Sequence, residues 1–510
     1  MTDRWLLAGP TLVQAGEPAR PVDVVIDDGL IAEVAPAGTV DRGGQRVVDA
    51  AHRLLIAGLV NAHTHSHANL HKGVGDRWTL EVSLLNGAWM AARDPAQQYA
   101  AARLGAIEHL RRGTTTVFDL VSCWPEPTPE LLAATVAGYR SVGVRAVLAP
   151  MLADRTVLAA IGPLGAAAES HHRTDPIPTG TVLAQAERLV AAWPQCRGGA
   201  DPAADHAAGG AADLATGAAP VALLALAPTI PLHCADELMV GLAVLARAAG
   251  LRLHLHLAES PLQAAEGRRR YGCSLVAHLE RIGLLGPDLT VAHAIHLSAE
   301  DRALLAASGT RAVHVPGSNL RLGSGTAAVR ALLDAGVPVG LATDGCNSSD
   351  HLNLFEAMRL ASGLGRPAEA DRHRWLGAHD VLALAGAGGA AACGLDGGDG
   401  RPPIGRIEVG AAADLVLLDA GAWPYVPVND LHRQLVYVED GSSIRTVIVA
   451  GRVVLDDGRP TMVDEAEVLA EAVTAAAALR AATPAERRAA DAAVAAIETA
   501  LTAERAAGPA

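Results

Sequence analysis

Residues 54–73 read LLIAGLVNAHTHSHANLHKG, an apolar run followed by four histidines at positions 63, 65, 67 and 71. The apolar part, 54–61, is typical of a strand buried on both faces. Side chains alternate along a strand, so His63 and His65 point to the same side. The stretch therefore predicts a buried strand that ends in a pair of imidazoles.

Seven further strand-like runs follow, each separated from the next by a longer Ala- and Leu-rich stretch typical of a helix. This alternation predicts parallel strands joined by helices. Eight such units spread over roughly 340 residues predict an α/β fold, a (β/α)8 TIM barrel. We expect the strands at 54–61, 114–120, 144–150, 220–226, 251–257, 289–293, 311–315 and 337–343.

The two chain ends differ from this central segment. Residues 1–57 and 400–460 contain Val-, Ile- and Leu-rich runs between glycine turns, and we expect them to pair as a composite β-sandwich beside a barrel of residues 58–399. Residues 196–220 are Gly-, Ala- and Asp-rich without periodicity and predict a mobile insertion. Residues 461–510 predict a tail of two helices, packed on the body or on another subunit, with a capping box at 483–486 (TPAE).

Charge and cysteine content exclude several classes of partner. The net charge of −14 argues against a nucleic-acid or anionic-membrane surface, because both need clustered Lys and Arg. No apolar run reaches the roughly 18 residues of a membrane span. The six cysteines form no C-x-x-C pair, as is typical of a reduced protein. We expect a cytoplasmic protein that acts on a small-molecule substrate. We also expect the protein to form a homo-oligomer, a dimer or larger.

Polar side chains gather at the carboxyl ends of the expected strands, where the active site of such a barrel lies. The first strand ends at His63 and His65, the fifth in HLHLAE (254–259), the sixth at His293 and the eighth at Asp344. A single histidine on an apolar strand is usually structural. Imidazoles and carboxylates at four strand ends, however, match the ligands of a divalent metal such as zinc.

Six motifs taken together resemble the amidohydrolase superfamily: GLVNAHTHSH, HLHLAES, TVAHAIHLS, PGSNLRLGSG, ATDGCNSSD and IEVGAAADLVLLD. The similar branch contains cytosine deaminase, S-adenosylhomocysteine deaminase, guanine deaminase and the triazine chlorohydrolases. The resemblance covers about residues 5–455. It implies one metal ion held by His63, His65, His256 and Asp344, and the catalytic residues Glu259, His293 and Asp344.

The resemblance also implies a reaction. The metal lowers the pKa of its water, Asp344 and His293 orient and deprotonate that water, and the resulting metal hydroxide attacks an sp2 carbon. Glu259 carries a proton to the ring nitrogen and then to the leaving group. His254 lies further from the strand end than His256, so we expect it in the barrel interior, and we expect His296 in a loop.

Lys72 is the only lysine of the chain and lies after the first strand. A binuclear site bridged by a carbamylated lysine, as in other branches of the superfamily, is therefore excluded. The cytidine-deaminase type of zinc site is unsupported, because no P-C-x-x-C accompanies an H-x-E. We expect one divalent metal, Zn2+, with Fe2+ or Mn2+ as alternatives.

The positions on the substrate side depart from the relatives. Thr229 stands where several relatives have a histidine, His233 is displaced by four positions, and HVP (314–316) replaces His-Asn-Pro. Lys72 stands where arginine is common. The relatives' own substrates therefore do not transfer. Candidate substrate contacts are His67, His71, Lys72, Trp89, Trp124, Arg155 and His233.

The leading hypothesis is a metal-dependent hydrolase that deaminates an amino-substituted N-heterocycle, such as a purine, pyrimidine, pterin or triazine. A second hypothesis keeps the same centre but changes the bond to C–Cl, amidine, guanidine or cyclic amide. A third is a non-catalytic, amidohydrolase-like assembly protein. The third is disfavoured because the chain retains all four expected ligands and both proton-handling residues.

Overall fold

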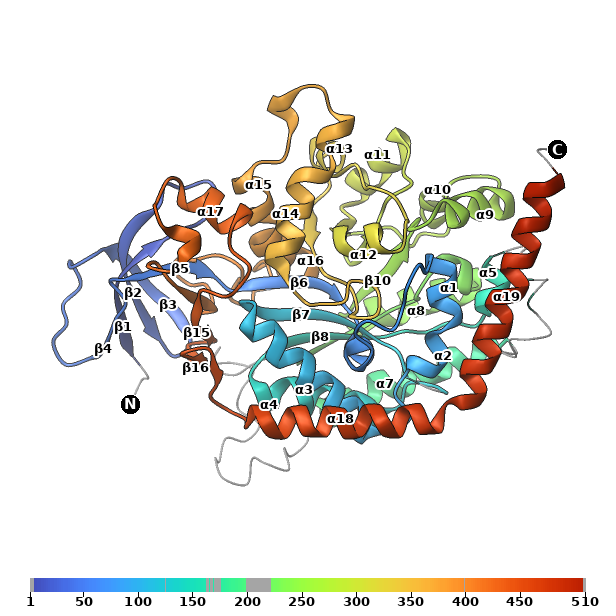
Figure 1. Cartoon of the computed structure of the whole chain (residues 1–510), viewed down its shortest axis with the longest axis horizontal. Coiled ribbons are helices and arrows are strands. Elements are labelled where there is room, and N and C mark those ends of the chain that lie inside the picture. The colour runs from blue at the N-terminus through green and yellow to red at the C-terminus, as the bar shows by residue number, and fades with distance from the viewer. Residues whose placement is uncertain are drawn as a thin grey trace.

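The computed structural model describes residues 4–123, 125–161, 165, 168, 176–198, 222–398 and 400–507. Its centre is an eight-stranded parallel sheet in the order β13-β12-β11-β10-β9-β8-β7-β6 (Figure 1). The fold class predicted from the sequence is confirmed. The strands are β6 (Leu59–Thr64), β7 (Thr114–Val121), β8 (Arg145–Pro150), β9 (Ala222–Leu226), β10 (Arg252–Leu257), β11 (Leu289–His293), β12 (Arg311–His314) and β13 (Val339–Leu341).

The first and last strands of this sheet meet through hydrogen bonds just past β13. The amide of Asp344 donates to the carbonyl of His63 at 3.0 Å. Next to it, the Asn61 side chain donates to the Thr343 hydroxyl at 2.7 Å and accepts from the Thr343 amide at 3.0 Å. The closure therefore places Asp344 beside the histidines of β6.

Helices cover the outside of the barrel between successive strands, as the alternating pattern predicts. The longer ones are α3 (Pro95–Arg111), α4 (Pro129–Val142), α7 (Thr179–Gly198), α8 (Asp236–Ala248), α9 (Pro261–Tyr271), α11 (Ala299–Ser308) and α14 (Leu354–Leu364). Four of these helices begin after an N-cap residue whose side chain accepts a hydrogen bond from the backbone amide three residues later. These N-cap residues are Asp94, Thr128, Ser260 and Ser298. The predicted insertion at 196–220 lies outside the described residues from position 199 onward.

The chain ends pair with each other, as expected, in one nine-stranded sheet of order β17-β16-β15-β14-β5-β1-β2-β3 with β4 beside β1. The central pairing, β5 with β14, is antiparallel. The strands are β1 (Trp5–Leu12), β2 (Arg20–Asp27), β3 (Leu30–Pro36), β4 (Arg46–Asp49), β5 (Arg53–Ala57), β14 (Leu415–Asp419), β15 (Ile444–Val449), β16 (Arg452–Asp456) and β17 (Arg459–Pro460). The buried pair Arg145–Asp414, 3.2 Å apart, joins this sheet to the barrel.

The structure corrects one expected strand. The run 54–61 is two strands, β5 in the terminal sheet and β6 in the barrel, separated at Gly58. A Cβ at Gly58 would lie 2.2 Å from the Thr115 hydroxyl, so only glycine lets the chain pass this closely between the two sheets. A continuous apolar run hides this break because both strands are buried.

The C-terminal tail forms two helices, α18 (Glu465–Ala482) and α19 (Pro484–Ala507), as predicted. Figure 1 shows α18 along one edge of the barrel and α19 rising beside α1 (Leu80–Leu85), α2 (Gly87–Met90) and α5 (Val157–Ala160). Arg103 of α3 pairs with Glu471 of α18 at 2.6 Å, and Arg93 pairs with Glu486 of α19 at 3.1 Å. The Thr483 hydroxyl donates to the Leu479 carbonyl.

One helical stretch in the described residues, Arg372–Cys393, is long and apolar enough to cross a membrane by length and composition. Its most apolar window is 61% buried inside the protein. Part of it, α16 (Gly389–Cys393), packs against β6 and β13. We interpret the stretch as a core helix of the barrel.

Candidate metal centre

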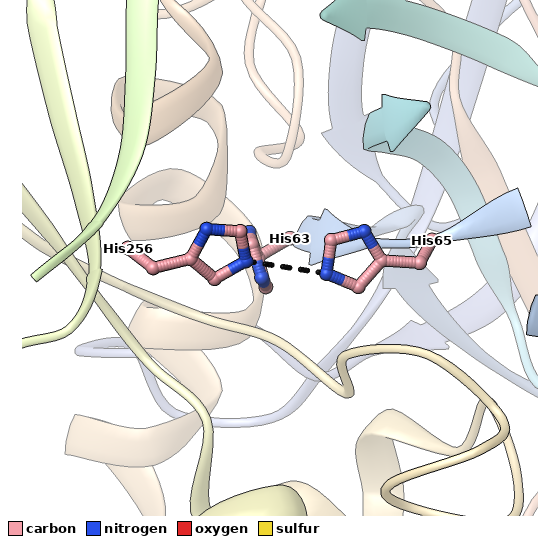
Figure 2. Close-up of side chains that lie close together, drawn as sticks. All are labelled: His63, His65 and His256. Atoms are coloured by element: carbon pink, nitrogen blue, oxygen red, sulfur yellow. Dashed lines mark hydrogen bonds between the residues drawn. The ribbon is translucent and has the colours of Figure 1, made fainter. Parts of the chain in front are cut away.

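Three histidines from two strands converge at the carboxyl end of the barrel. His63 and His65 come from the end of β6, and His256 comes from β10, with ligand atoms within 4.8 Å of one another. Figure 2 shows the three rings turned toward a common point. The Nε2 atoms of His65 and His256 lie 3.3 Å apart.

The outer nitrogen of each ring has a partner, which settles which nitrogen faces inward. Nδ1 of His65 donates to the Leu120 carbonyl at 2.7 Å, and Nδ1 of His256 donates to the Thr229 carbonyl at 2.8 Å. A carbonyl only accepts, so Nδ1 carries a proton in both rings and Nε2 is the atom that faces inward. Two neutral rings would bring two Nε2 lone pairs within 3.3 Å of each other, so this pair favours a positive charge in the site. Burial alone would lower the pKa of His65, but the hydrogen bond and charge of Asp344 outweigh it and raise that pKa, so a proton is favoured where a metal ion would supply the same charge.

His63 follows the same pattern. Its Nδ1 lies 3.2 Å from Nε2 of His254, and its own Nε2 is buried without a hydrogen-bond partner. Burial and the neighbouring imidazoles lower the pKa of His63 well below its ordinary value, so the ring is neutral. A neutral ring with one nitrogen engaged and the other free is the usual state of a metal-ligating histidine.

Asp344 adds a carboxylate to the three rings. Its Oδ1 lies 3.2 Å from Nε2 of His65 and 3.9 Å from Nε2 of His63, and it accepts from the Gly345 amide at 2.7 Å. Burial alone would raise the pKa of Asp344, but the hydrogen bond and charge of His65 outweigh it and lower that pKa. Three imidazole nitrogens and an ionised carboxylate fit a divalent metal such as zinc.

His293 and Glu259 lie beside this set. Nε2 of His293 is 3.6 Å from Oε2 of Glu259 and 3.9 Å from Oδ2 of Asp344. The other nitrogen, Nδ1, lies 2.9 Å from Oδ1 of Asn319. With the amide oriented this way Nδ1 carries the proton, so Nε2 is free to accept one.

Glu259 is only 2% exposed. Burial and the negative charges of Asp344 and Glu81 raise its pKa well above the ordinary value. The protonated form is therefore favoured for Glu259, and the ionised form is favoured for Asp344. Two carboxyl groups whose pKa values are shifted in opposite directions in one site are suited to proton donation and charge stabilisation respectively.

The backbone is strained where these residues leave their strands. Ala258, His293, Ala294 and Asp344 have φ angles of 47°, 68°, 47° and 72°. Residues other than glycine adopt this left-handed region at a cost of about 1–3 kcal/mol, and such strain concentrates at functional sites. It occurs here at the ends of β10 and β11 and just past β13, which are three of the four strand ends that supply the site.

The other candidate residues lie around this centre. His67 accepts from the Ser122 amide, and its ring is 5.4 Å from that of His65. His71 lies 3.0 Å from the Met90 carbonyl, with its ring edge-on to Trp89. Trp89 is buried beneath the Arg487 guanidinium of α19 at 4.1 Å.

The remaining three described candidates have structural partners, and Trp124 lies outside the described residues. Lys72 pairs with Glu108 and lines a surface hollow of about 580 Å³ together with Arg111 and Arg112. The amide of Arg155 donates to the His233 carbonyl at 2.9 Å. Burial and the charge of Arg270 lower the pKa of His233 to about 4.

Sequence reasoning missed three contributors. His254 was expected only as an interior residue, yet it contacts a candidate ligand. Asn319 belongs to the quoted motif PGSNLRLGSG, but that motif carried no role for it. Thr229 contributes its backbone carbonyl, which a comparison of side chains does not reveal.

Known proteins are similar to this chain over most of its length. The amidohydrolase family model matches residues 54–454. The chain is 31% identical to 5'-deoxyadenosine deaminase of Methanosarcina mazei, over 89% of this chain and 92% of the relative. It is 32% identical to 5-methylthioadenosine/S-adenosylhomocysteine deaminase of Syntrophobacter fumaroxidans, over 90% and 94%.

Two solved structures with bound zinc are also similar. An adenosine deaminase from Xanthomonas campestris has a TM-score of 0.77 and 27% identity, covering 94% of this chain and 98% of that one. An atrazine chlorohydrolase from Arthrobacter aurescens has a TM-score of 0.77 and 25% identity, covering 92% and 100%.

Proposed function

Because the chain belongs to the amidohydrolase family, we propose that it is a metal-dependent hydrolase that deaminates an amino-substituted N-heterocycle. The observation that carries this proposal is the pair of inward-facing Nε2 atoms of His65 and His256, set beside Asp344, whose pKa is lowered, and Glu259, whose pKa is raised. Two Nε2 atoms that face each other beside a carboxylate support a cation site, and the two carboxyl groups support proton transfer.

We assign the metal to His63, His65, His256 and Asp344. Zinc is the favoured ion because two similar structures contain it, and Fe2+ and Mn2+ are the alternatives. When bound, the ion supplies Lewis-acid chemistry that lowers the pKa of water toward neutrality. Lys72 is the only lysine of the chain, so a site with two metals bridged by a carbamylated lysine is excluded, and we propose a single metal ion.

The chain's own residues handle the protons. Asn319 holds His293 so that Nε2 faces the site, where this nitrogen and Asp344 accept the proton of the attacking water. Glu259, protonated at the outset, donates to a ring nitrogen of the substrate and so makes the attacked carbon more electrophilic. The proton taken from water then passes to the amino group, which leaves as ammonia when the C–N bond breaks. The second proton of the former water returns to Glu259 as the carbonyl of the product forms.

The substrate class follows from the relatives and stays broad. The named relatives deaminate adenosine-type compounds, which favours an aminopurine or related ring. The atrazine chlorohydrolase favours the second candidate, hydrolysis of C–Cl or another polar bond at the same centre. Substrate contacts by His67, His71, Trp89 and the other candidates, the cytoplasmic location and the homo-oligomeric state stay predictions.

Elemental analysis of the purified protein, combined with an ammonia-release screen, tests this function. The screen covers aminated purines, pyrimidines, pterins and triazines. We expect one equivalent of a divalent metal and ammonia release from at least one class, both lost in His256→Ala. If the whole panel is silent while a chlorinated triazine or a cyclic amide is hydrolysed, deamination is wrong and the second candidate stands.

A metal-free protein, with any activity unaffected by His256→Ala, would contradict both candidates. That outcome would favour a non-catalytic protein of the same fold.

A further inference from the structure

The carboxylate of Glu81 reaches the strand end that carries Glu259. Glu81 lies in α1, the short helix between β6 and β7, and its Oε1 accepts a hydrogen bond of 2.6 Å from the Ser260 hydroxyl. Ser260 is 179 positions further along the chain. The mechanism above uses Glu259 but gives no role to either partner of this bond.

Ser260 connects this bond to the backbone of Glu259. As the N-cap of α9, the Ser260 hydroxyl oxygen accepts from the Gln263 amide at 3.1 Å. The side-chain oxygen of Gln263 in turn accepts from the Glu259 amide at 2.9 Å. Because the Ser260 oxygen already serves as acceptor, its one hydrogen is available for Glu81. Three hydrogen bonds therefore run from Glu81 to the amide of Glu259.

Apolar contacts hold the same two helices together. Leu85 of α1 belongs to a buried cluster with Ala493 and Ile497 of α19, and Leu262 of α9 packs against this cluster. The polar link at Glu81 thus lies next to an apolar one. Together they fix the position of α1 relative to the start of α9.

Glu259 needs this support because its backbone is strained. Ala258, the residue before it, has a φ of 47°, and β10 ends at Leu257. The Glu259 carboxyl must still stay close to His293, 3.6 Å away. A hydrogen bond to a charged acceptor is stronger than one between neutral groups, so the Glu81 carboxylate is a firm anchor.

We propose that Glu81 is a positioning residue that, through Ser260 and Gln263, holds Glu259 in reach of the reacting ring nitrogen. The inference rests on the proposed function, because that function makes Glu259 the proton donor. The position of α1 is then coupled to that of the proton donor, so correct placement of α1 affects the rate of the chemical step. The negative charge of Glu81 additionally favours the neutral form of Glu259.

Steady-state kinetics of Glu81→Ala, Glu81→Gln and Ser260→Ala test the proposal. We expect kcat to fall about tenfold to a hundredfold in Glu81→Ala and Ser260→Ala, the size of one lost charge-assisted hydrogen bond, with KM within about threefold. Glu81→Gln keeps an acceptor and should recover part of the rate. The double variant Glu81→Ala/Ser260→Ala should be no slower than the slower single variant, because both remove the same bond.

Asp76→Ala is the matched control, since it removes a carboxylate five positions earlier that is 90% exposed and pairs only with Arg77 among the described residues. Its kcat should equal that of the wild type. A Glu81→Ala variant that raises KM at unchanged kcat, or a Ser260→Ala variant with wild-type kcat, would overturn the proposal in favour of a direct substrate contact or no role.

Hydrogen exchange of backbone amides separates this inference from the proposed function. Exchange at 259–263 should be faster in Glu81→Ala than in the wild type or Asp76→Ala, whether or not any heterocycle is turned over. Unchanged exchange overturns the link itself. Faster exchange in a protein that releases no ammonia keeps the link and contradicts only the proposed function.

Discussion

The Nδ1 atom of His63 lies 3.2 Å from the Nε2 atom of His254, deep inside the barrel. His254 also packs edge-on against Phe118, with ring centroids 4.4 Å apart, so it has little freedom to rotate. A residue two positions before the candidate ligand His256 thus orients the candidate ligand His63 on a different strand. Such outer partners fix the tautomer and direction of a ligating ring.

His254→Ala should weaken metal binding about tenfold to a hundredfold, because His63 loses the partner that directs its Nε2 inward. Competition with a chelator measures this. His278→Ala is the control, since His278 is a buried histidine whose described contacts are with Asp236, Tyr271 and Arg281, away from the candidate metal site. Equal metal affinity in His254→Ala and the wild type would show that the contact is not needed.

Glu259→Gln should lower kcat by at least about a hundredfold while the metal content stays at the wild-type level. The amide has nearly the same shape but cannot donate a carboxylic proton. Glu266→Gln, on the helix α9 that follows Glu259, removes a buried carboxylate that pairs with Arg269 and Arg270, and should retain turnover. A Glu259→Gln enzyme with wild-type kcat would assign proton donation to another group.

Activity should decline on the alkaline side of the pH profile. The pKa of Glu259 is raised by burial and by the charges of Asp344 and Glu81, so the acid keeps its proton where an ordinary glutamate has lost it. Rising pH removes this proton only as it passes the raised pKa, and the donor is then lost. The profile of kcat against pH, measured with metal saturating, checks the direction.

The same shift affects stability. The folded state binds the Glu259 proton more tightly than the unfolded state, so the contribution to stability is complete below the unfolded pKa and disappears as pH rises through the folded one. Glu259→Gln has no proton to lose at this position. Urea unfolding at several pH values should therefore show the wild type losing stability relative to Glu259→Gln as pH rises. The opposite slope would contradict the raised pKa.

Ile497→Ala should lower the free energy of unfolding by about 2–4 kcal/mol, because the side chain fills the buried cluster between α19, α1 and α5. Val473→Ala on α18 is the control, since Val473 is 69% exposed and should change stability by less than about 0.5 kcal/mol. Denaturant unfolding compares the two. Equal, small changes in the free energy of unfolding for both variants would mean that packing of α19 against α1 and α5 does not stabilise the protein.

The sequence by itself determined the barrel, the pairing of the chain ends and the helical tail. Strand and helix periodicity are local properties, and each of the eight barrel strands lies at or within two residues of an expected run, apart from β6. The residue types of the candidate metal ligands could also be predicted from the sequence, because each of them ends or follows an apolar run. They are His63, His65, His256 and Asp344. Strand ends of a parallel barrel meet at one face, so their convergence followed from the topology.

Only the tertiary structure decided how these groups are oriented. The break at Gly58 depends on how closely Thr115 approaches, and the free nitrogens of His63 and His293 depend on His254 and Asn319. The link from Glu81 to Ser260 spans 179 positions. A local pattern specifies which residue type stands at a strand end. The partner that fixes its proton and direction comes from another part of the chain, and only folding brings the two together.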